Sequence, residues 1–333
     1  MGAFNLMGGG PGQQAKNGFK IMLLSNLSGA FDVGLAQRLR PCHNNDHTET
    51  RIDPEDDSHP SEADMEPRYT EEMAFLHDLG CRAGAELTKR FGSDVRVRQK
   101  ADRTLVTDAD LASEKLILET LQHKRPKDKI FSEEAGLSSA DRTPGTSIWI
   151  IDPLDGTTNF ANNYPFFCVS IGRGEFDAQG RIRLMSGAVH DPIRGKTYVA
   201  ERGKGAWVNE KRIHVGPDRN PQDAFIVTGF AYHRGENLKK DTEFFLAVAQ
   251  TCQSIRRDGA AALDLALVAE GVYDGYWESG LRAWDLAAGA LLVDEAGGIV
   301  RNFVSPEGAR YDLEQGDIIC GTPSIVQLIS GLV

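Results

Sequence analysis

One stretch of the chain carries most of the information about both fold and chemistry, and it runs Ile148-Trp149-Ile150-Ile151-Asp152-Pro153-Leu154-Asp155-Gly156-Thr157-Thr158-Asn159-Phe160. Its first four residues are apolar, and such a run predicts a short buried strand. Pro153 fixes one backbone angle and Gly156 permits a tight turn, so we expect the strand to stop at Asp152. The stretch therefore predicts an apolar strand that leads directly into a polar turn.

The polar turn carries two carboxylates, Asp152 and Asp155, with the peptide carbonyl of Leu154 between them. Such a turn can present all three groups to one point. Carboxylate and carbonyl oxygens are hard donors that suit Mg²⁺ better than Zn²⁺. Taken alone, this stretch is as consistent with a solvated aspartate turn as with a metal site. Other segments have to decide between the two interpretations.

Three other segments place carboxylates beside apolar residues. Glu133 and Glu134 follow an apolar step, Asp285 stands at the expected start of a helix, and Asp110 follows Leu105–Thr107. Each segment alone is more simply interpreted as a solvated helix start or as a helix cap, which is worth ~1 kcal/mol. Their meaning therefore depends on the four segments being considered together.

Together, these segments form a pattern that resembles the inositol monophosphatase family, within the lithium-sensitive, magnesium-dependent phosphatases. The resemblance runs from about Thr70 to the C-terminus, and it includes two complete hallmark motifs. The first is Asp152–Phe160, and the second is Trp284–Gly289, which continues into Glu295–Gly298. Three further segments match in order and spacing: Glu133-Glu134, Gly203–Ala206 and Arg256–Leu265.

The resemblance implies a site for two or three Mg²⁺ ions. Glu133, Asp152 and the carbonyl of Leu154 would hold one ion. Asp152, Asp155 and Asp285 would hold a second, with Asp152 bridging the pair. A third, weaker ion is expected near Glu133, and Li⁺ is expected to inhibit by displacing a Mg²⁺.

The resemblance also implies the catalytic groups. Thr157, aided by Asp110, would orient the attacking water, and Glu133 would act with them from the metal site. The backbone N–H groups of Gly156 and Thr157 would bind phosphate oxygens. Phosphate-monoester hydrolysis is very slow without a catalyst, and two ions ~3.5–4 Å apart can activate the water and stabilise the leaving oxygen. The sequence has no GxSxG elbow and no Cys-x5-Arg loop that would supply a covalent nucleophile.

The expected substrate is myo-inositol monophosphate, which would be hydrolysed to inositol and phosphate. Glu278 matches a glutamate that accepts hydrogen bonds from substrate hydroxyls in the family, and Gly259, Ala260 and Ala261 match the wall that contacts the ring. The alternative for Glu278 is a surface glutamate. Histidinol phosphate, fructose bisphosphate or another small phosphate monoester remain alternative substrates, and a non-catalytic regulatory protein on the same scaffold is the alternative outside enzymes.

Three arginines near these segments allow two interpretations. Arg256, Arg257 and Arg282 could form a rim that attracts anions. A surface ion pair, which stabilises a fold little, is the alternative.

The periodicity of the chain predicts the fold class. Apolar residues recur at three- and four-residue steps from Thr70 to about Gly92, and a second helix is expected after Thr107. Strand-like runs within 167–215, the last of them over 205–215, predict an antiparallel sheet. Strands and helices alternate after Val215, and one helix is expected over Asp241–Cys252. We expect an α+β N-terminal metal-site domain over 69–215 and an α/β C-terminal domain over 216–333. The resemblance makes these a layered αβαβα sandwich of the sugar-phosphatase type.

Residues 1–68 differ in composition from the rest. They are rich in glycine and acidic residues and poor in periodic apolar residues, so they predict a disordered acidic extension. The 333-residue chain has a net charge of -11, which argues against nucleic acid as a partner. No apolar run reaches the roughly 20 residues of a membrane helix, so no membrane partner is expected.

The five cysteines are scattered and form no CxxC pair, which argues against a disulfide framework or a zinc site. A reducing, cytoplasmic location is therefore expected. The resemblance implies a homodimer, because members of the family usually form one.

Overall fold

The computed structural model describes residues 69–93, 97–99, 105–230, 236–306 and 308–333. These residues fall within one compact unit of the chain. The predicted extension over residues 1–68 lies outside them.

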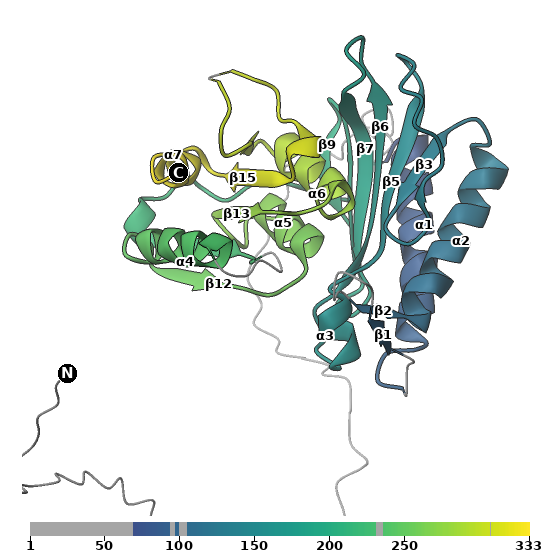
Figure 1. Cartoon of the computed structure of the whole chain (residues 1–333), viewed down its shortest axis with the longest axis horizontal. Helices are drawn as coiled ribbons and strands as arrows, with labels where there is room; N and C mark the ends of the chain where they lie inside the picture. The colour runs from purple at the N-terminus through teal and green to yellow at the C-terminus, as the bar shows by residue number, and fades with distance from the viewer. Residues whose placement is uncertain (1–68, 94–96, 100–104, 231–235, 307) are drawn as a thin grey trace, which may run out of the picture. The chain divides into compact units, whose positions relative to one another are not determined.

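The first layer is a pair of helices, α1 (Glu71–Thr88) and α2 (Asp108–Lys124). The Thr70 side chain caps α1 by accepting a hydrogen bond from the N–H of Met73. Thr107 caps α2 and forms a capping box with Asp110. A short antiparallel pair of strands, β1 (Val97–Gln99) and β2 (Leu105–Thr107), leads into α2. Both helices cover one face of the large sheet (Figure 1).

The second layer is an eight-stranded sheet in the order β10-β9-β8-β7-β6-β5-β3-β4. Neighbouring strands from β5 to β10 are antiparallel, as predicted for 167–215, whereas β3 and β5 are parallel. The strands are β3 (Lys129–Ser132), β4 (Gly136–Leu137), β5 (Ser147–Asp155), β6 (Cys168–Phe176), β7 (Ile182–Asp191), β8 (Lys196–Glu201), β9 (Gly205–Val208) and β10 (Lys211–Ile213).

The third layer consists of α5 (Ala261–Ala269) and α6 (Ala283–Glu295), which pack between the two sheets (Figure 1). Both helices are rich in alanine, so they approach the sheet closely. A Cβ on Gly172 of β6 would lie only 2.7 Å from the Cβ of Ala287, so a glycine is needed at that contact. This close packing fixes α6 against the strand that neighbours β5.

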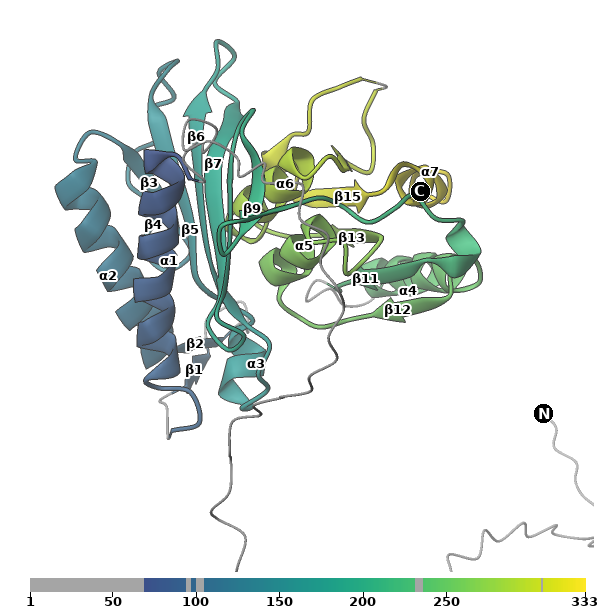
Figure 2. The same ribbon diagram turned by 180° about the vertical axis from the view of Figure 1, so that it is seen from behind.

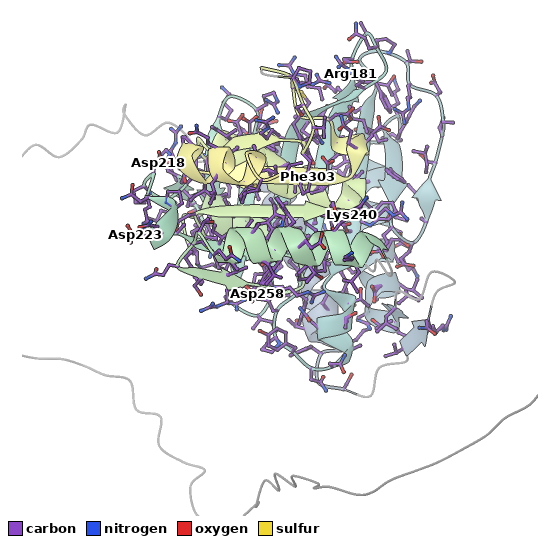
Figure 3. All side chains as sticks on the ribbon, turned by 60° about the vertical axis from the view of Figure 1, so that its left-hand side comes forward. Arg181, Asp218, Asp223, Lys240, Asp258 and Phe303 are labelled. Atoms are coloured by element: carbon purple, nitrogen blue, oxygen red, sulfur yellow. The ribbon has the colours of Figure 1, made fainter. Side chains whose placement is uncertain are left out.

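The fourth layer is a five-stranded sheet in the order β12-β11-β13-β15-β14, and the fifth is a pair of outer helices (Figure 2). The outer helices pack on this sheet through a buried apolar cluster, which contains Val248 and Ile325 from the helices and Trp277 from the sheet. Figure 3 views this side, with Lys240 on α4 and Phe303 between α4 and the C-terminal elements. The elements are β11 (Phe225–Thr228), α4 (Glu236–Ala249), β12 (Ser254–Arg256), β13 (Gly275–Ser279), β14 (Ile299–Arg301), β15 (Asp317–Gly321) and α7 (Pro323–Ser330).

The predicted αβαβα layering is confirmed, and three boundaries differ from expectation. The strand expected to stop at Asp152 continues to Asp155, with a shift of register between the two aspartates. The run over 205–215 is two strands joined at Asn209 and Glu210, both of which have positive φ. The helix expected from Asp241 begins already at Glu236.

The division into two domains after residue 215 stays a prediction. The eight-stranded sheet ends at Ile213 and the five-stranded sheet begins at Phe225. Among the described residues no helix is both long and apolar enough to cross a membrane. The four cysteines in the described part of the chain are all free thiols.

Candidate active site

A cavity of about 530 Å³ brings together segments that are far apart in the sequence. It lies where the end of β5 meets the start of α3 (Thr157–Ala161), the starts of α5 and α6, and β13. The cavity is lined by every residue predicted to bind metal or substrate: Glu133, Asp152, Leu154, Asp155, Gly156, Thr157, Gly259, Ala261, Glu278 and Asp285.

The two carboxylates of the turn are held by backbone hydrogen bonds. Asp152, which is 3 % exposed, accepts a bond from the N–H of Leu154 over 3.0 Å. Asp155 Oδ2 accepts a bond from the N–H of Ala262, at the start of α5, over 2.7 Å. The second bond joins β5 to α5, so α5 and the turn fix each other's position.

The other two carboxylates reach the cavity from different layers. Asp285 lies in the first turn of α6, where its Oδ2 accepts a hydrogen bond from the N–H of Arg282 over 2.7 Å. It therefore caps the helix and lines the cavity at once. Glu133 follows β3, and its N–H donates to the carbonyl of Ile151 on β5 over 3.1 Å. Because β3 and β5 are parallel, their carboxyl ends meet at one edge of the sheet.

Asp110 is not among the lining residues, but it contacts one of them, Thr157. Its Oδ1 is 3.2 Å from the hydroxyl of Thr157, and that hydroxyl also lies 3.0 Å from the carbonyl oxygen of Leu154. The three predicted catalytic residues are thus distributed over the lining, with Thr157 and Glu133 in it and Asp110 in contact with Thr157.

These carboxylates are buried and repel one another, and both effects raise their pKa values. Burial, followed by the charge of Glu133, raises the pKa of Asp152 well above its ordinary value. Burial and then Asp155 do the same to the pKa of Asp285. Burial raises the pKa of Asp155 to about 6 and the pKa of Asp110 to about 7. A divalent cation would relieve this repulsion, because it favours the ionised form of every nearby carboxylate.

The donor set fits a hard cation such as Mg²⁺, because the lining offers carboxylate oxygens and one carbonyl and no thiolate or imidazole group. Within the described ranges, no three His, Cys, Asp or Glu side chains form a ready-made cation cage. In keeping with this, Asp152, Asp155 and Asp285 each have one oxygen engaged by a backbone N–H.

The lining of the cavity also includes Glu278 on β13. It is only 7 % exposed, so the alternative of a surface glutamate is wrong. The Tyr276 hydroxyl donates a hydrogen bond to Glu278, and burial raises the pKa of Glu278 to about 7. Gly229, after β11, leaves the room that Glu278 occupies, since a Cβ there would lie 2.0 Å from its Oε2.

The three arginines divide between two environments. Arg257 and Arg282 line the cavity, as the anion-attracting rim requires. The guanidinium of Arg256 instead lies 4.8 Å from the ring centroid of Phe225 and hydrogen-bonds Ser254.

Sequence reasoning missed one carboxylate in the lining, Asp264. It lies in α5 and is 1 % exposed, and its Oδ1 has no hydrogen-bond partner among the residues that the structure describes. Burial, followed by the charge of Asp258, raises its pKa well above the ordinary value. The available signal was a single acidic residue inside the apolar run 260–269, since isolated buried carboxylates are rare.

Comparison with known proteins identifies the family of the chain. The family model described as "Inositol monophosphatase family" matches residues 69–330. A "Nus factor SuhB" of Pseudomonas aeruginosa is 40% identical over 229 residues, which cover 68% of this chain and 82% of the relative. An "Inositol-1-monophosphatase" of Synechocystis is 39% identical over 249 residues, which cover 74% of this chain and 83% of the relative.

Solved structures with the same fold carry the same two names. The extragenic suppressor protein SuhB of Bartonella henselae superposes with a TM-score of 0.71 at 35% identity, covering 79% of this chain and 98% of that structure. An inositol monophosphatase from Anabaena gives a TM-score of 0.68 at 34% identity, covering 78% of this chain and 94% of that structure.

Proposed function

The chain belongs to the inositol monophosphatase family, and from this we propose that it hydrolyses myo-inositol monophosphate to inositol and phosphate. Family membership supports a phosphatase that acts on a small phosphate monoester, and enzymes of this family are generally metal-dependent. The observation that supports this substrate is the cavity itself, whose lining combines the carboxylate cluster with the buried Glu278.

We propose that the carboxylate cluster holds two or three Mg²⁺ ions. Glu133, Asp152, Asp155, Asp285 and the carbonyl of Leu154 would be the ligands, which the raised pKa values of the three aspartates support. When bound, Mg²⁺ would neutralise the phosphoryl oxygens and make water a better nucleophile at neutral pH. The protein's part is to hold these oxygens in one place before the substrate arrives.

Thr157 and Asp110 are proposed to position the attacking water. The Thr157 hydroxyl is within reach of Asp110 Oδ1, so it can donate to that carboxylate and accept a hydrogen bond from a water. Asp110, with a pKa of about 7, can take up a proton near neutral pH. The N–H groups of Gly156 and Thr157, in the tight turn after β5, would bind phosphate oxygens.

Glu278 is proposed to recognise the alcohol part of the substrate. Its burial next to Tyr276 holds the carboxyl group at the cavity wall, where it can accept hydrogen bonds from ring hydroxyls. Gly259 and Ala261 would contribute the small residues that let a ring approach the wall. A site built to hydrogen-bond a hydroxyl discriminates strongly against analogues that lack it.

A substrate panel with purified protein tests the proposal. Inositol-1-phosphate, histidinol phosphate, fructose bisphosphate and an aryl phosphate are compared with Mg²⁺ and with EDTA. We expect the highest kcat/KM for inositol-1-phosphate, dependence on Mg²⁺, and no turnover by Asp155→Asn at unchanged fold. A clear preference for histidinol phosphate, or full activity in EDTA, would overturn the proposal.

A second candidate function comes from the name "Nus factor", which several relatives of 37–40% identity carry. A role of this protein that does not require hydrolysis would persist in a variant that has no phosphatase activity. Replacing the native gene by the Asp155→Asn variant separates the two functions. If the variant restores every phenotype of a deletion strain, the role is independent of hydrolysis. If it restores none, hydrolysis is required.

A further inference from the structure

Asp264 is a buried residue in the lining of the cavity, and part of the hydrogen-bonding capacity of its carboxyl group is unused. It lies in the first turn of α5, where its N–H donates to the carbonyl of Ala260 over 2.9 Å. The residue lines the cavity and is 1 % exposed, and its Oδ1 has no partner within the described part of the chain. Buried polar atoms nearly always have a partner, so this one calls for an explanation.

The surroundings of Asp264 would accept an apolar side chain. Its neighbours Leu263 and Leu265 are fully buried, and α5 packs within the main hydrophobic core. An unpartnered carboxyl group in such a place destabilises the fold relative to an apolar residue of similar size. Groups of this kind are retained where a ligand supplies the missing contact, at the expense of stability.

Asp264 is close both to the carboxylate cluster and to Glu278. The N–H of Ala262, in the same turn of α5, holds Asp155 of the cluster. The charges of Asp155 and Glu278 both act on Asp264, and Arg257, another lining residue, opposes them. A ligand that contacts both the carboxylate cluster and Glu278 would therefore lie near Asp264.

We propose that Asp264 hydrogen-bonds a hydroxyl group of the substrate and, with Glu278, sets the preference for polyol phosphates. This inference rests on the proposed function and adds a specificity residue to it. A hydroxyl suits this position because the unpartnered Oδ1 of Asp264 can accept a hydrogen bond from it. A hydroxyl can also accept a hydrogen bond, so it can pair with a carboxyl group in either protonation state.

The test compares two substrates in two variants of Asp264. Inositol-1-phosphate offers hydroxyls to the wall of the cavity, whereas p-nitrophenyl phosphate offers none. Asp264→Leu is expected to lower kcat/KM for inositol-1-phosphate about tenfold, mainly through KM, which corresponds to one lost hydrogen bond. The ratio of kcat/KM between the two substrates should fall at least fivefold. Asp264→Asn, which still donates and accepts, should keep that ratio within about threefold of the wild-type value.

A matched control removes a different buried oxygen. The hydroxyl of Tyr311 is also without a partner among the described residues, and it lies at another cavity, beside Arg310. Tyr311→Phe should leave the substrate ratio unchanged. Thermal melting and circular dichroism of each variant check that it is folded.

Two outcomes overturn the inference while the proposed function stands. One is an equal loss on both substrates in Asp264→Leu, which indicates a structural role. The other is a loss in Asp264→Asn as large as in Asp264→Leu, which indicates that the charge is what matters. Failure of the proposed function is a separate result, because wild-type protein would then show no preference for inositol-1-phosphate over the aryl phosphate.

Discussion

The hydroxyl oxygen of Thr157 lies 3.2 Å from Oδ1 of Asp110, although the two residues are 47 positions apart in the chain. The other carboxylate oxygen of Asp110 accepts hydrogen bonds from the N–H of Thr107, over 2.8 Å, and from its hydroxyl, over 2.6 Å. One carboxylate therefore belongs both to the cap of α2 and to the candidate active site. The interpretation of this segment as a helix cap is confirmed, and the contact with Thr157 is compatible with the predicted role in the site.

Replacing Asp110 by asparagine should remove the acceptor for a proton while keeping the cap. An asparagine oxygen can still accept from Thr107, so we expect little change in stability. Turnover of inositol-1-phosphate with Mg²⁺ should fall about 10²–10⁴-fold, which is the usual contribution of a general base. Asp108→Asn, in the same helical turn, is the control and should stay near wild-type activity. Retention of more than a tenth of the wild-type kcat in Asp110→Asn would contradict the assignment.

Gly229 offers a second test, directed at Glu278. A methyl group at this position would lie 2.0 Å from Oε2 and 2.4 Å from Cδ of Glu278, so the glutamate would have to move. Gly229→Ala should raise KM for inositol-1-phosphate about tenfold or more and change turnover of an aryl phosphate much less.

The control for this prediction is another glycine. A Cβ on Gly331 would make only ordinary contacts, the nearest at 3.4 Å, so Gly331→Ala should change neither substrate's kinetics. An unchanged KM in Gly229→Ala would mean that Glu278 does not contact the substrate alcohol.

The parts of the candidate site that depend on local chain geometry could be predicted from the sequence. Asp152, Asp155 and Thr157 come from one strand and one turn, so their closeness follows from the local sequence with Pro153 and Gly156, although α5 and Asp110 also contact the turn. The periodic apolar residues of α1 and the caps of α2 were equally local, and both helices formed where they were expected.

The parts that depend on long-range pairing could not be predicted in the same way. Glu133 reaches the cavity because β3 pairs in parallel with β5, and this pairing leaves no periodic signal in a four-residue strand. Glu278 is buried because β13 is a central strand of the second sheet, between β11 and β15. Asp264 was overlooked because it interrupts an apolar helix by a single residue.

Removing the metal should make stability depend on pH through the carboxylate cluster. In the metal-free protein the pKa of Asp155 is raised to about 6, and the pKa values of Asp152 and Asp285 are also raised. The ordinary pKa of an aspartate in an unfolded chain is about 3.9. A raised pKa in the folded state stabilises the fold fully below about pH 4, and this stabilisation is lost as pH rises through the folded-state value.

Under the proposed function Mg²⁺ would bind the ionised carboxylates, so it should stabilise the fold at the pH values where these groups have lost their protons. The increase in melting temperature on adding Mg²⁺ to EDTA-treated protein should therefore be larger at pH 8 than at pH 5.5. Differential scanning calorimetry at the two pH values measures it, and Asp155→Asn should lose most of the increase at pH 8. An equal or larger increase at pH 5.5 would contradict the proposed ligand set.

His190 should make the stability of the fold depend on pH in a way that does not involve the candidate metal site. It lies on β7, where it is 7 % exposed and packs against α1, with its Nδ1 2.8 Å from the Thr197 hydroxyl. A Cβ on Gly84 of α1 would lie 2.3 Å from the His190 ring, so the ring fills the space between helix and sheet. Burial lowers the pKa of His190 to about 4, with His77 adding to the effect and Asp191 opposing it.

A lowered pKa means that the unfolded chain binds a proton more readily than the folded protein does. Between about pH 6.5 and pH 4 the unfolded state is therefore favoured progressively, and stability is lost as pH falls. From pH 7.5 to pH 5 wild-type protein should lose about 2 kcal/mol more than His190→Gln, which has no group to titrate. Urea unfolding at the two pH values measures the difference, with the exposed His214 as control. His214→Gln should show the same loss as wild type. If His190→Gln also lost as much stability as wild type, the histidine would have to be protonated within the fold. Its packing against α1 would then have to tolerate a charge.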